Sequence, residues 1–139
     1  MSKYYFDTEF HGLHLISVGV VCEDGREFYA ETPTARTLAS LTPWLVNNVY
    51  VHLDDVNIRT EAQIAGDLFR LVSGDKNPEF RGYFADYDWV LICECFGGML
   101  HNPLGHLAYD IAQEARRLGI RFQTNTPRHK AIDCARWTK

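Results

Sequence analysis

The 139-residue chain has no long hydrophobic run, although 46% of its residues are hydrophobic. A membrane-spanning helix needs about 18 or more consecutive apolar residues, and no segment approaches that length. The first ten residues, MSKYYFDTEF, carry two acids and lack the apolar core of a signal peptide. We therefore expect a cytoplasmic protein that does not enter a membrane.

Cysteine is scarce, and its spacing excludes the common metal-binding and redox motifs. The four cysteines are Cys22, Cys93, Cys95 and Cys134, and no two of them form a Cys-x-x-Cys pair. The single residue between Cys93 and Cys95 is too short a spacer for a zinc knuckle. We expect four buried thiols without a disulfide.

Repeats, linkers and low-complexity segments are also missing. A chain of this length suits one domain and can bury a core of its own. We therefore expect a single domain over residues 1–139.

The net charge of −4 argues against a protein that coats nucleic acid without specificity. The charge is unevenly distributed, because the segment from Arg116 onward has seven basic residues and a single acid, Asp133. Such a basic end beside an acidic body is suited to steer a phosphate backbone towards a carboxylate site. An ordinary solvated helix face would show the same pattern.

β-Rich segments open the chain and predict an antiparallel meander. They cover residues 4–10, 15–21 and 27–31, and two shorter strands are predicted at residues 80–84 and 120–122. Apolar spacings of three and four predict helices. Four helices are predicted. The first starts at Pro43 after the cap Thr42, and the second runs from the cap Thr60 to Val72. The third runs from His106 to Leu118 before Gly119, and the last passes through Ala131 and Ala135.

Residues 88–93 fit either a strand or a helix. The order of the elements predicts a mixed sheet covered by helices.

Asp7 and Glu9 are two residues apart in the first predicted strand, so their side chains project to the same face of the sheet. Two buried carboxylates repel each other and cost several kcal/mol without partners. A divalent cation such as Mg²⁺ or Mn²⁺ prefers carboxylate oxygens and would remove the repulsion. An edge strand with two solvated acids would give the same spacing.

Asp88 and the pair formed by His129 and Asp133 each have a structural and a functional interpretation. Asp88 precedes an apolar run, where it would act either as a helix N-cap or as a third buried acid. His129 and Asp133 share one face of the last predicted helix, where a histidine is either structural or catalytic.

Together, these residues resemble the motifs of the DEDDh 3′–5′ exonucleases. The three motifs are, in order, Asp7-Thr8-Glu9-Phe10, Ala85-Asp86-Tyr87-Asp88, and His129-Lys130-Ala131 followed by Asp133. The strand at 15–21, the segment 44–49 and Tyr109-Asp110 extend the similarity to the small polyadenylate-specific 3′-exoribonucleases of bacteria and phages. The resemblance covers nearly the whole chain.

The resemblance implies an α/β, ribonuclease-H-like fold with a central mixed five-stranded sheet flanked by helices. It implies a metal-dependent exoribonuclease that removes nucleoside 5′-monophosphates from the 3′ ends of single-stranded, adenylate-rich RNA. Two divalent cations, Mg²⁺ or Mn²⁺, would bind to the metal ligands Asp7, Glu9, Asp88 and Asp133.

The same resemblance assigns His129 as the base that takes a proton from the attacking water. It assigns Phe10 and His11 to the terminal nucleotide, and Arg128 and Lys130 to phosphates. Phe10 is equally suited to the core. A homodimer is compatible with the family.

One departure from the family pattern concerns the last acid. The family spaces its histidine and final aspartate as His-x4-Asp, whereas this chain has His129-x3-Asp133 and places Cys134 at the usual position. A shift of one residue turns a helical side chain by about 100°, and a thiolate is a poor ligand for Mg²⁺. Either the helix starts differently and Asp133 reaches the metal, which we favour, or the site is weakened. Two alternatives therefore stay open: an exonuclease acting on single-stranded DNA, and a catalytically weakened nucleic-acid-binding protein of the same fold.

Overall fold

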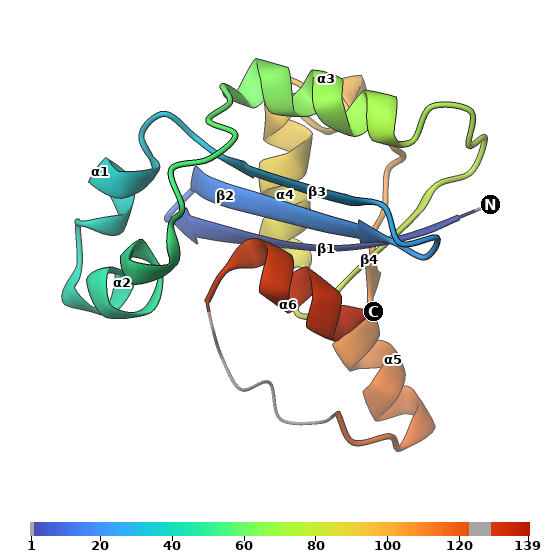
Figure 1. The fold of residues 1–139 in the computed structure, drawn as a ribbon. Coiled ribbons are helices and arrows are strands. Elements are labelled where there is room, and N and C mark those ends of the chain that lie inside the picture. Colours follow the sequence, from blue (N-terminus) through green and yellow to red (C-terminus); the bar gives the residue numbers. More distant parts are fainter. Residues whose placement is uncertain (1, 123–128) are drawn as a thin grey trace.

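The computed structural model describes residues 2–122 and 129–139, and the strands in these ranges form one mixed sheet (Figure 1). They are β1 (Lys3–His11), β2 (His14–Cys22), β3 (Glu27–Glu31), β4 (Glu79–Gly82) and β5 (Tyr109–Asp110). Their order is β3-β2-β1-β4-β5. The pairs β1–β2 and β2–β3 are antiparallel, whereas β4 runs parallel to β1 and β5 parallel to β4. The predicted five-stranded mixed sheet is confirmed, and β1 is its central strand.

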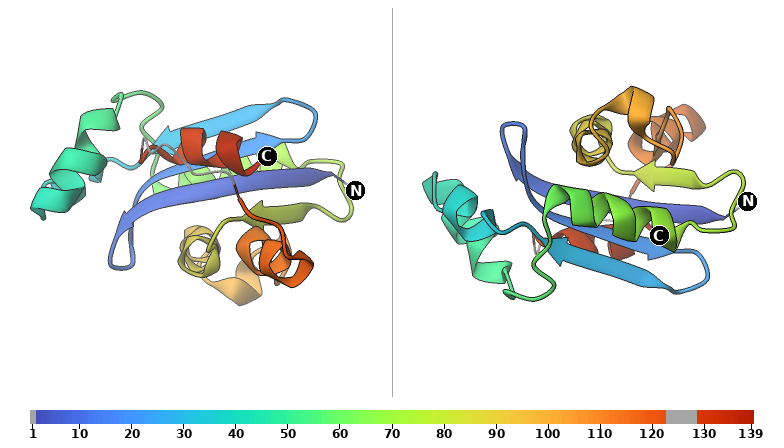
Figure 2. Two further views of the ribbon diagram at one scale, coloured as in Figure 1. Left: turned by 90° about the horizontal axis from the view of Figure 1, so that it is seen from below. Right: turned by 90° about the horizontal axis from the view of Figure 1, so that it is seen from above.

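Helices cover both faces of this sheet. The helices are α1 (Ala35–Ala39), α2 (Pro43–Asn48), α3 (Glu61–Leu71), α4 (Asp86–Cys95), α5 (Ile111–Leu118) and α6 (Ala131–Thr138), with 3₁₀ turns at Tyr50–His52 and Met99–His101. The two views of Figure 2 show α6 on one face of the sheet and α3 on the other. No helix in the described ranges is long and apolar enough to cross a membrane.

The main core lies between β1 and the helices α3 and α4. Tyr4 and Phe6 of β1 are fully buried there, against Ile64 and Leu68 of α3 and Ile92 of α4. Because successive side chains of a strand point to opposite faces, the alternate residues of β1 are turned towards α6. The hydrophobic pattern of β1 therefore places its acids on the face covered by the last helix.

Helix α6 lies unusually close to the sheet, because Gly19 of β2 has no side chain. A Cβ atom at position 19 would lie 2.4 Å from the backbone nitrogen of Ile132 and 2.5 Å from the carbonyl carbon of Ala131. Gly19 is also the cross-strand neighbour of Asp7. The first turn of α6 thus packs directly beside the acidic stretch of β1.

The predicted helix starts at Thr42 and Thr60 are confirmed by their hydrogen bonds. The Thr42 hydroxyl accepts from the backbone N–H of Leu45, and Thr60 forms a reciprocal capping box with Gln63. The ambiguous segment 88–93 is helical. All four thiols are buried, and the described chain contains no disulfide, as predicted.

Two predicted boundaries and one predicted strand are wrong. The helix predicted from His106 begins at Ile111, because Asp110 caps it through the N–H groups of Ala112 and Gln113 while residues 109–110 pair with β4. The strand predicted to reach Phe84 ends at Gly82, and Phe84 has a positive φ of 51° in the following turn. Residues 120–122 form no strand.

We predict that Gly19→Ala destabilises the fold, because the added methyl group would meet helix backbone, which cannot rotate aside. The expected loss is about 1–3 kcal/mol, the usual cost of overpacking, measured by urea unfolding. Gly66→Ala is the matched control, since the nearest atom to its added methyl is Arg70 Nη1 at 3.6 Å. Within helix α3 that change should stabilise by up to about 1 kcal/mol. Equal stabilities for the two variants would contradict the close packing of α6.

Candidate metal centre

The central strand β1 continues beyond its parallel neighbour β4, and this overhang carries the acids. Strand β4 pairs only with Lys3, Tyr4 and Tyr5, so the rest of that edge is open. Asp88, in the first turn of α4, fills the gap: its Oδ1 accepts hydrogen bonds from the Thr8 backbone N–H at 2.7 Å and the Thr8 hydroxyl at 2.6 Å. Asp88 therefore does not cap α4 but joins the acids at the carboxyl end of β1.

Asp7, Glu9 and Cys134 form a group whose ligand atoms all lie within 4.8 Å of one another. Asp7 and Glu9 come from β1, and Cys134 comes from the first turns of α6. The Cys134 thiol is hydrogen-bonded to the Asp7 carboxyl group. This set of oxygen and sulfur donors could hold a metal ion.

Burial and mutual repulsion disfavour the charged forms of the three acids. Loss of water contacts, followed by the charges of Asp88 and Glu9, raises the pKa of Asp7 well above its ordinary value. Burial and then Asp88 raise the pKa of Glu9 to about 8. Burial also raises the pKa of Asp88, although the two hydrogen bonds from Thr8 oppose the shift. No positively charged side chain contributes to the pKa shifts of Asp7 or Glu9.

Glu9 shows this deficit most clearly. Its side chain is 9% exposed, and no hydrogen bond or ion pair reaches its carboxylate from the described residues. Burial is the largest cause of the raised pKa of Asp7, and Glu9 is nearly buried as well, so the alternative of two solvated acids on an edge strand is excluded. A nearly buried carboxylate without a donor is costly, and a cation is a partner that would suit it.

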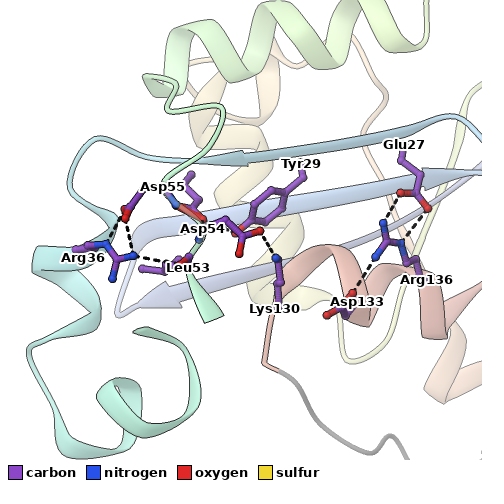
Figure 3. Close-up of polar contacts among 10 residues, drawn as sticks. Glu27, Tyr29, Arg36, Leu53, Asp54, Asp55, Lys130, Asp133 and Arg136 are labelled. Atoms are coloured by element: carbon purple, nitrogen blue, oxygen red, sulfur yellow. Dashed lines mark hydrogen bonds and ion pairs between the residues drawn. The ribbon is translucent and has the colours of Figure 1, made fainter. Parts of the chain in front are cut away.

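The structure does not bring Asp133 into the group of Asp7 and Glu9. The Asp133 carboxylate accepts a hydrogen bond from Arg136 Nη1 at 2.9 Å, and Arg136 also grips Glu27 of β3 with two hydrogen bonds of 3.0 and 2.7 Å (Figure 3). Neighbouring helical positions are about 100° apart. When Cys134 faces Asp7, Asp133 must face β3.

The structure describes two other residues of the third motif, His129 and Lys130. His129 lies two residues before α6, where its ring packs edge-on against Trp44 at 5.0 Å. Lys130 does not present a free ammonium group, because it is paired with Asp54 and lies over the ring of Tyr29 (Figure 3). Arg128 lies outside the described residues.

Phe10, predicted to contact the terminal nucleotide, directly follows Glu9 in β1. Phe10 is half-buried against the main core and stacks on Tyr87 with ring centroids 5.8 Å apart and planes 12° apart. Tyr87 immediately precedes Asp88 and is 59% exposed. His11 ends β1 and pairs with His14 across the hairpin.

Residues that the sequence did not single out as site residues also build this region. Cys134 is a potential ligand, Thr8 orients Asp88, and Tyr87 extends the aromatic surface. Asp110 accepts a hydrogen bond from the Ala85 N–H at 3.1 Å while capping α5, and so fixes the start of α4. Position 134 was detectable from the family spacing, whereas the role of Asp110 depends on a tertiary contact with no local signal.

The fold agrees with solved nuclease structures. An apo exonuclease I superposes with a TM-score of 0.59 at 16% identity, covering 99% of this chain and 40% of that one. An exonuclease I from the moderately thermophilic Methylocaldum szegediense gives 0.58 at 14% identity, covering 99% and 38%. The fold is ribonuclease-H-like. This confirms the predicted fold class, with its helices on both faces of a mixed sheet.

Sequence comparison finds relatives that carry a functional name. The chain is 34% identical over 110 residues to 3′–5′ exoribonucleases from two strains of Mycobacterium tuberculosis, which covers 73% of this chain and 65% of each relative. The chain thus spans slightly less than two thirds of their length. No family model matches it.

The raised pKa of Glu9 predicts an unusual pH dependence for the metal-free protein. Between about pH 4.5, the ordinary pKa, and about pH 8, the pKa in the fold, the folded chain binds more protons than the unfolded chain. The free energy of unfolding should therefore fall as the pH rises through this window. Thermal unfolding in EDTA, measured from about pH 5 to about pH 8, checks the direction.

Asp7→Asn should stabilise the metal-free protein by roughly 1–3 kcal/mol at pH 8, because it removes one of the repelling charges. Glu94→Gln on the exposed surface of α4 is the control and should change stability by less than about 0.5 kcal/mol. A stability that rises with pH in EDTA would show that the acids are not repelling one another.

Proposed function

We propose that this chain is a metal-dependent 3′–5′ exoribonuclease that releases nucleoside 5′-monophosphates from the 3′ end of single-stranded RNA. The observation that carries the proposal is the set of nearly buried acids Asp7, Glu9 and Asp88 at the carboxyl end of the central strand. A ribonuclease-H-like sheet and the exoribonuclease relatives support the same activity.

Divalent cations fit the donors of the site, and the resemblance to DEDDh exonucleases implies two of them, Mg²⁺ or Mn²⁺. Asp7, Glu9 and Asp88 would hold them with carboxylate oxygens, and Cys134 stands where the family has its last carboxylate. When bound, such ions stabilise the charge that develops on the scissile phosphate and favour ionisation of a water molecule.

His129 is the proposed base that accepts the proton of the attacking water. Burial, and then the charge of the nearby His52, lower the pKa of His129. The imidazole is therefore neutral at pH 7 and ready to accept a proton. Its edge contact with Trp44 fixes the plane of the ring.

The stacked pair Phe10 and Tyr87 provides a surface for the 3′-terminal base. The exposed ring of Tyr87 is next in sequence to Asp88, so a base stacked on it would lie beside the acids. Aromatic stacking suits single strands, whose bases are unpaired and open to contact. RNA is proposed as substrate because the relatives are named exoribonucleases, and adenylate preference follows the family resemblance.

Basic residues near the carboxyl end of the chain contribute less to phosphate binding than their number implies. Arg117 is paired with Glu114, Arg136 with Glu27, and Lys130 with Asp54. These pairs absorb much of the local positive charge. Binding of the RNA phosphates therefore depends mainly on the metal site, while the aromatic pair binds the base.

The activity is tested with a 5′-labelled single-stranded oligoadenylate RNA, incubated with Mg²⁺, Mn²⁺, Co²⁺ or EDTA. We expect a ladder that shortens from the 3′ end with at least one divalent cation and not with EDTA. Asp7→Asn should reduce the rate by roughly 100-fold or more, since it removes a charge that holds the cation. A DNA oligonucleotide of the same sequence, run in parallel, decides between RNA and DNA.

Asp24→Asn is the matched control, because it makes the same chemical change in an exposed turn and should leave the rate unchanged. An intact RNA in every lane, together with binding of the same RNA in a gel-shift assay, would identify a nucleic-acid-binding protein without catalysis. The withdrawal of Asp133 from the site gives that outcome a physical basis.

Tyr87→Ala should raise KM for short RNA about tenfold, because the stacking of one base on an aromatic ring is worth about 1–3 kcal/mol. Steady-state kinetics on a short oligoadenylate provide the measurement. Phe69→Ala is the matched control, since Phe69 is a similarly exposed ring, at 55%, on α3. An equal effect of both variants would remove the stacking role from Tyr87.

A further inference from the structure

Cys134 is the only non-carboxylate donor in the group that Asp7 and Glu9 form in the described chain. We infer that this group is a mixed carboxylate–thiolate site, which selects a thiophilic divalent cation such as Zn²⁺ or Co²⁺ over Mg²⁺. The inference deepens the proposed function, since it names the metal class of the same site. The inference depends on which face of α6 is turned towards Asp7, because that face carries Cys134.

The spacing of the donors suits a single ion. A tetrahedral zinc ion with one sulfur and two oxygen ligands, at about 2.3 and 2.1 Å, places those ligand atoms about 3.6 Å apart. The three donors here lie within 4.8 Å of one another, so side-chain adjustments alone bring them to a common ion. Three protein ligands leave one position open for water or a phosphate oxygen, as in catalytic zinc sites.

The helix cannot easily rotate to exchange Cys134 for Asp133. At its start, Lys130 is paired with Asp54 and lies over the ring of Tyr29. At its end, Arg136 holds Glu27 with a two-pronged contact and also binds Asp133 itself (Figure 3). A rotation of about 100° would be needed, and it would break these contacts.

Gly19 imposes a third constraint on the helix. Backbone atoms of Ala131 and Ile132 lie within 2.5 Å of the place where a Cβ at position 19 would stand. A helix in such close contact with a strand has little room to roll. The sulfur of Cys134 is therefore held beside the acids by the packing of α6 against Gly19 and by ion pairs near both ends of the helix.

The carboxylates of the group point independently to a cation. Glu9 is 9% exposed and its carboxylate has no hydrogen-bond donor among the described residues. Sulfur ligands favour Zn²⁺ and Co²⁺, whereas Mg²⁺ requires oxygen donors throughout. The combination of a donorless carboxylate and a neighbouring thiol separates this site from an ordinary acidic cluster.

Binding is accompanied by a defined proton transfer. The S–H bond of Cys134 breaks, its proton passes to solvent, and the thiolate donates an electron pair to the cation. Asp7 exchanges the thiol hydrogen bond for the metal. Cys134 releases one proton to solvent for each ion bound, and Asp7 and Glu9, whose pKa values are raised, also release to solvent any proton that they carry; no oxidation state changes.

The test is a titration of the metal-free 139-residue chain with Co²⁺, followed by absorption spectroscopy under reducing conditions. Coordination by Cys134 predicts a near-ultraviolet thiolate-to-cobalt charge-transfer band that saturates at one ion per site. Cys134→Ser should abolish the band and weaken Co²⁺ binding by roughly tenfold or more. Cys93→Ser should retain the band, since Cys93 is another buried thiol, on α4, with Asn102 as its partner.

Calorimetry on the same samples separates the outcomes. Co²⁺ binding without the charge-transfer band would overturn the inference and leave a carboxylate-only nuclease site intact. A thermal shift with Mg²⁺ but none with Co²⁺ would overturn it as well, again without harm to the proposed function. No response to any divalent cation would defeat both proposals.

Cys134→Asp is a second test, in which the expected result is a gain of Mg²⁺ affinity that a folding defect could not produce. The variant places a carboxylate at the position facing Asp7 and should exchange the preference, with Mg²⁺ binding strengthened about tenfold and the cobalt band absent. An unchanged Mg²⁺ affinity in a folded variant would show that the residue at position 134 does not contact the metal.

Discussion

The contact between α6 and the sheet at Gly19 is the constraint on which the site depends. It allows a helix to lie against β2 directly beside Asp7, the cross-strand neighbour of that glycine. Any side chain at position 19 would lift the helix and withdraw Cys134 from the acids. The arrangement of the site is therefore a consequence of backbone packing, and the ligands follow from it.

This arrangement has an electrostatic cost. Three acids of raised pKa meet where the central strand extends beyond β4. Thr8 compensates Asp88 with two hydrogen bonds and Cys134 compensates Asp7 with one, whereas Glu9 receives none from the described residues. The fold accommodates them because the opposite face of β1 buries Tyr4 and Phe6 in the main core. The apolar residues that stabilise the fold and the acids thus lie on the two faces of one strand.

Local patterns in the sequence predicted much of the fold. The β-rich segments that become β1 to β3 and the caps Thr42 and Thr60 are short-range signals, and the structure reproduces them. The two-residue strand β5 escaped prediction because its pairing partner β4 is distant in sequence, and periodicity carries no information about such a contact. The same limit explains why the role of Asp110 in placing α4 was missed.

The placement of Asp7 and Glu9 on one face of β1 was predictable because it depends only on local geometry. Side chains two residues apart in a strand share a face wherever the strand begins. A helix differs, because its faces depend on where its first turn is anchored. Here the anchors are the Lys130–Asp54 pair, the Arg136–Glu27 pair and Gly19, all of them tertiary. They turn Cys134 inward and Asp133 outward, so a motif that contains the right residue types presents a different donor. Motif spacing on a helix therefore identifies a candidate site, while the contacts that set the rotation of the helix decide its chemistry.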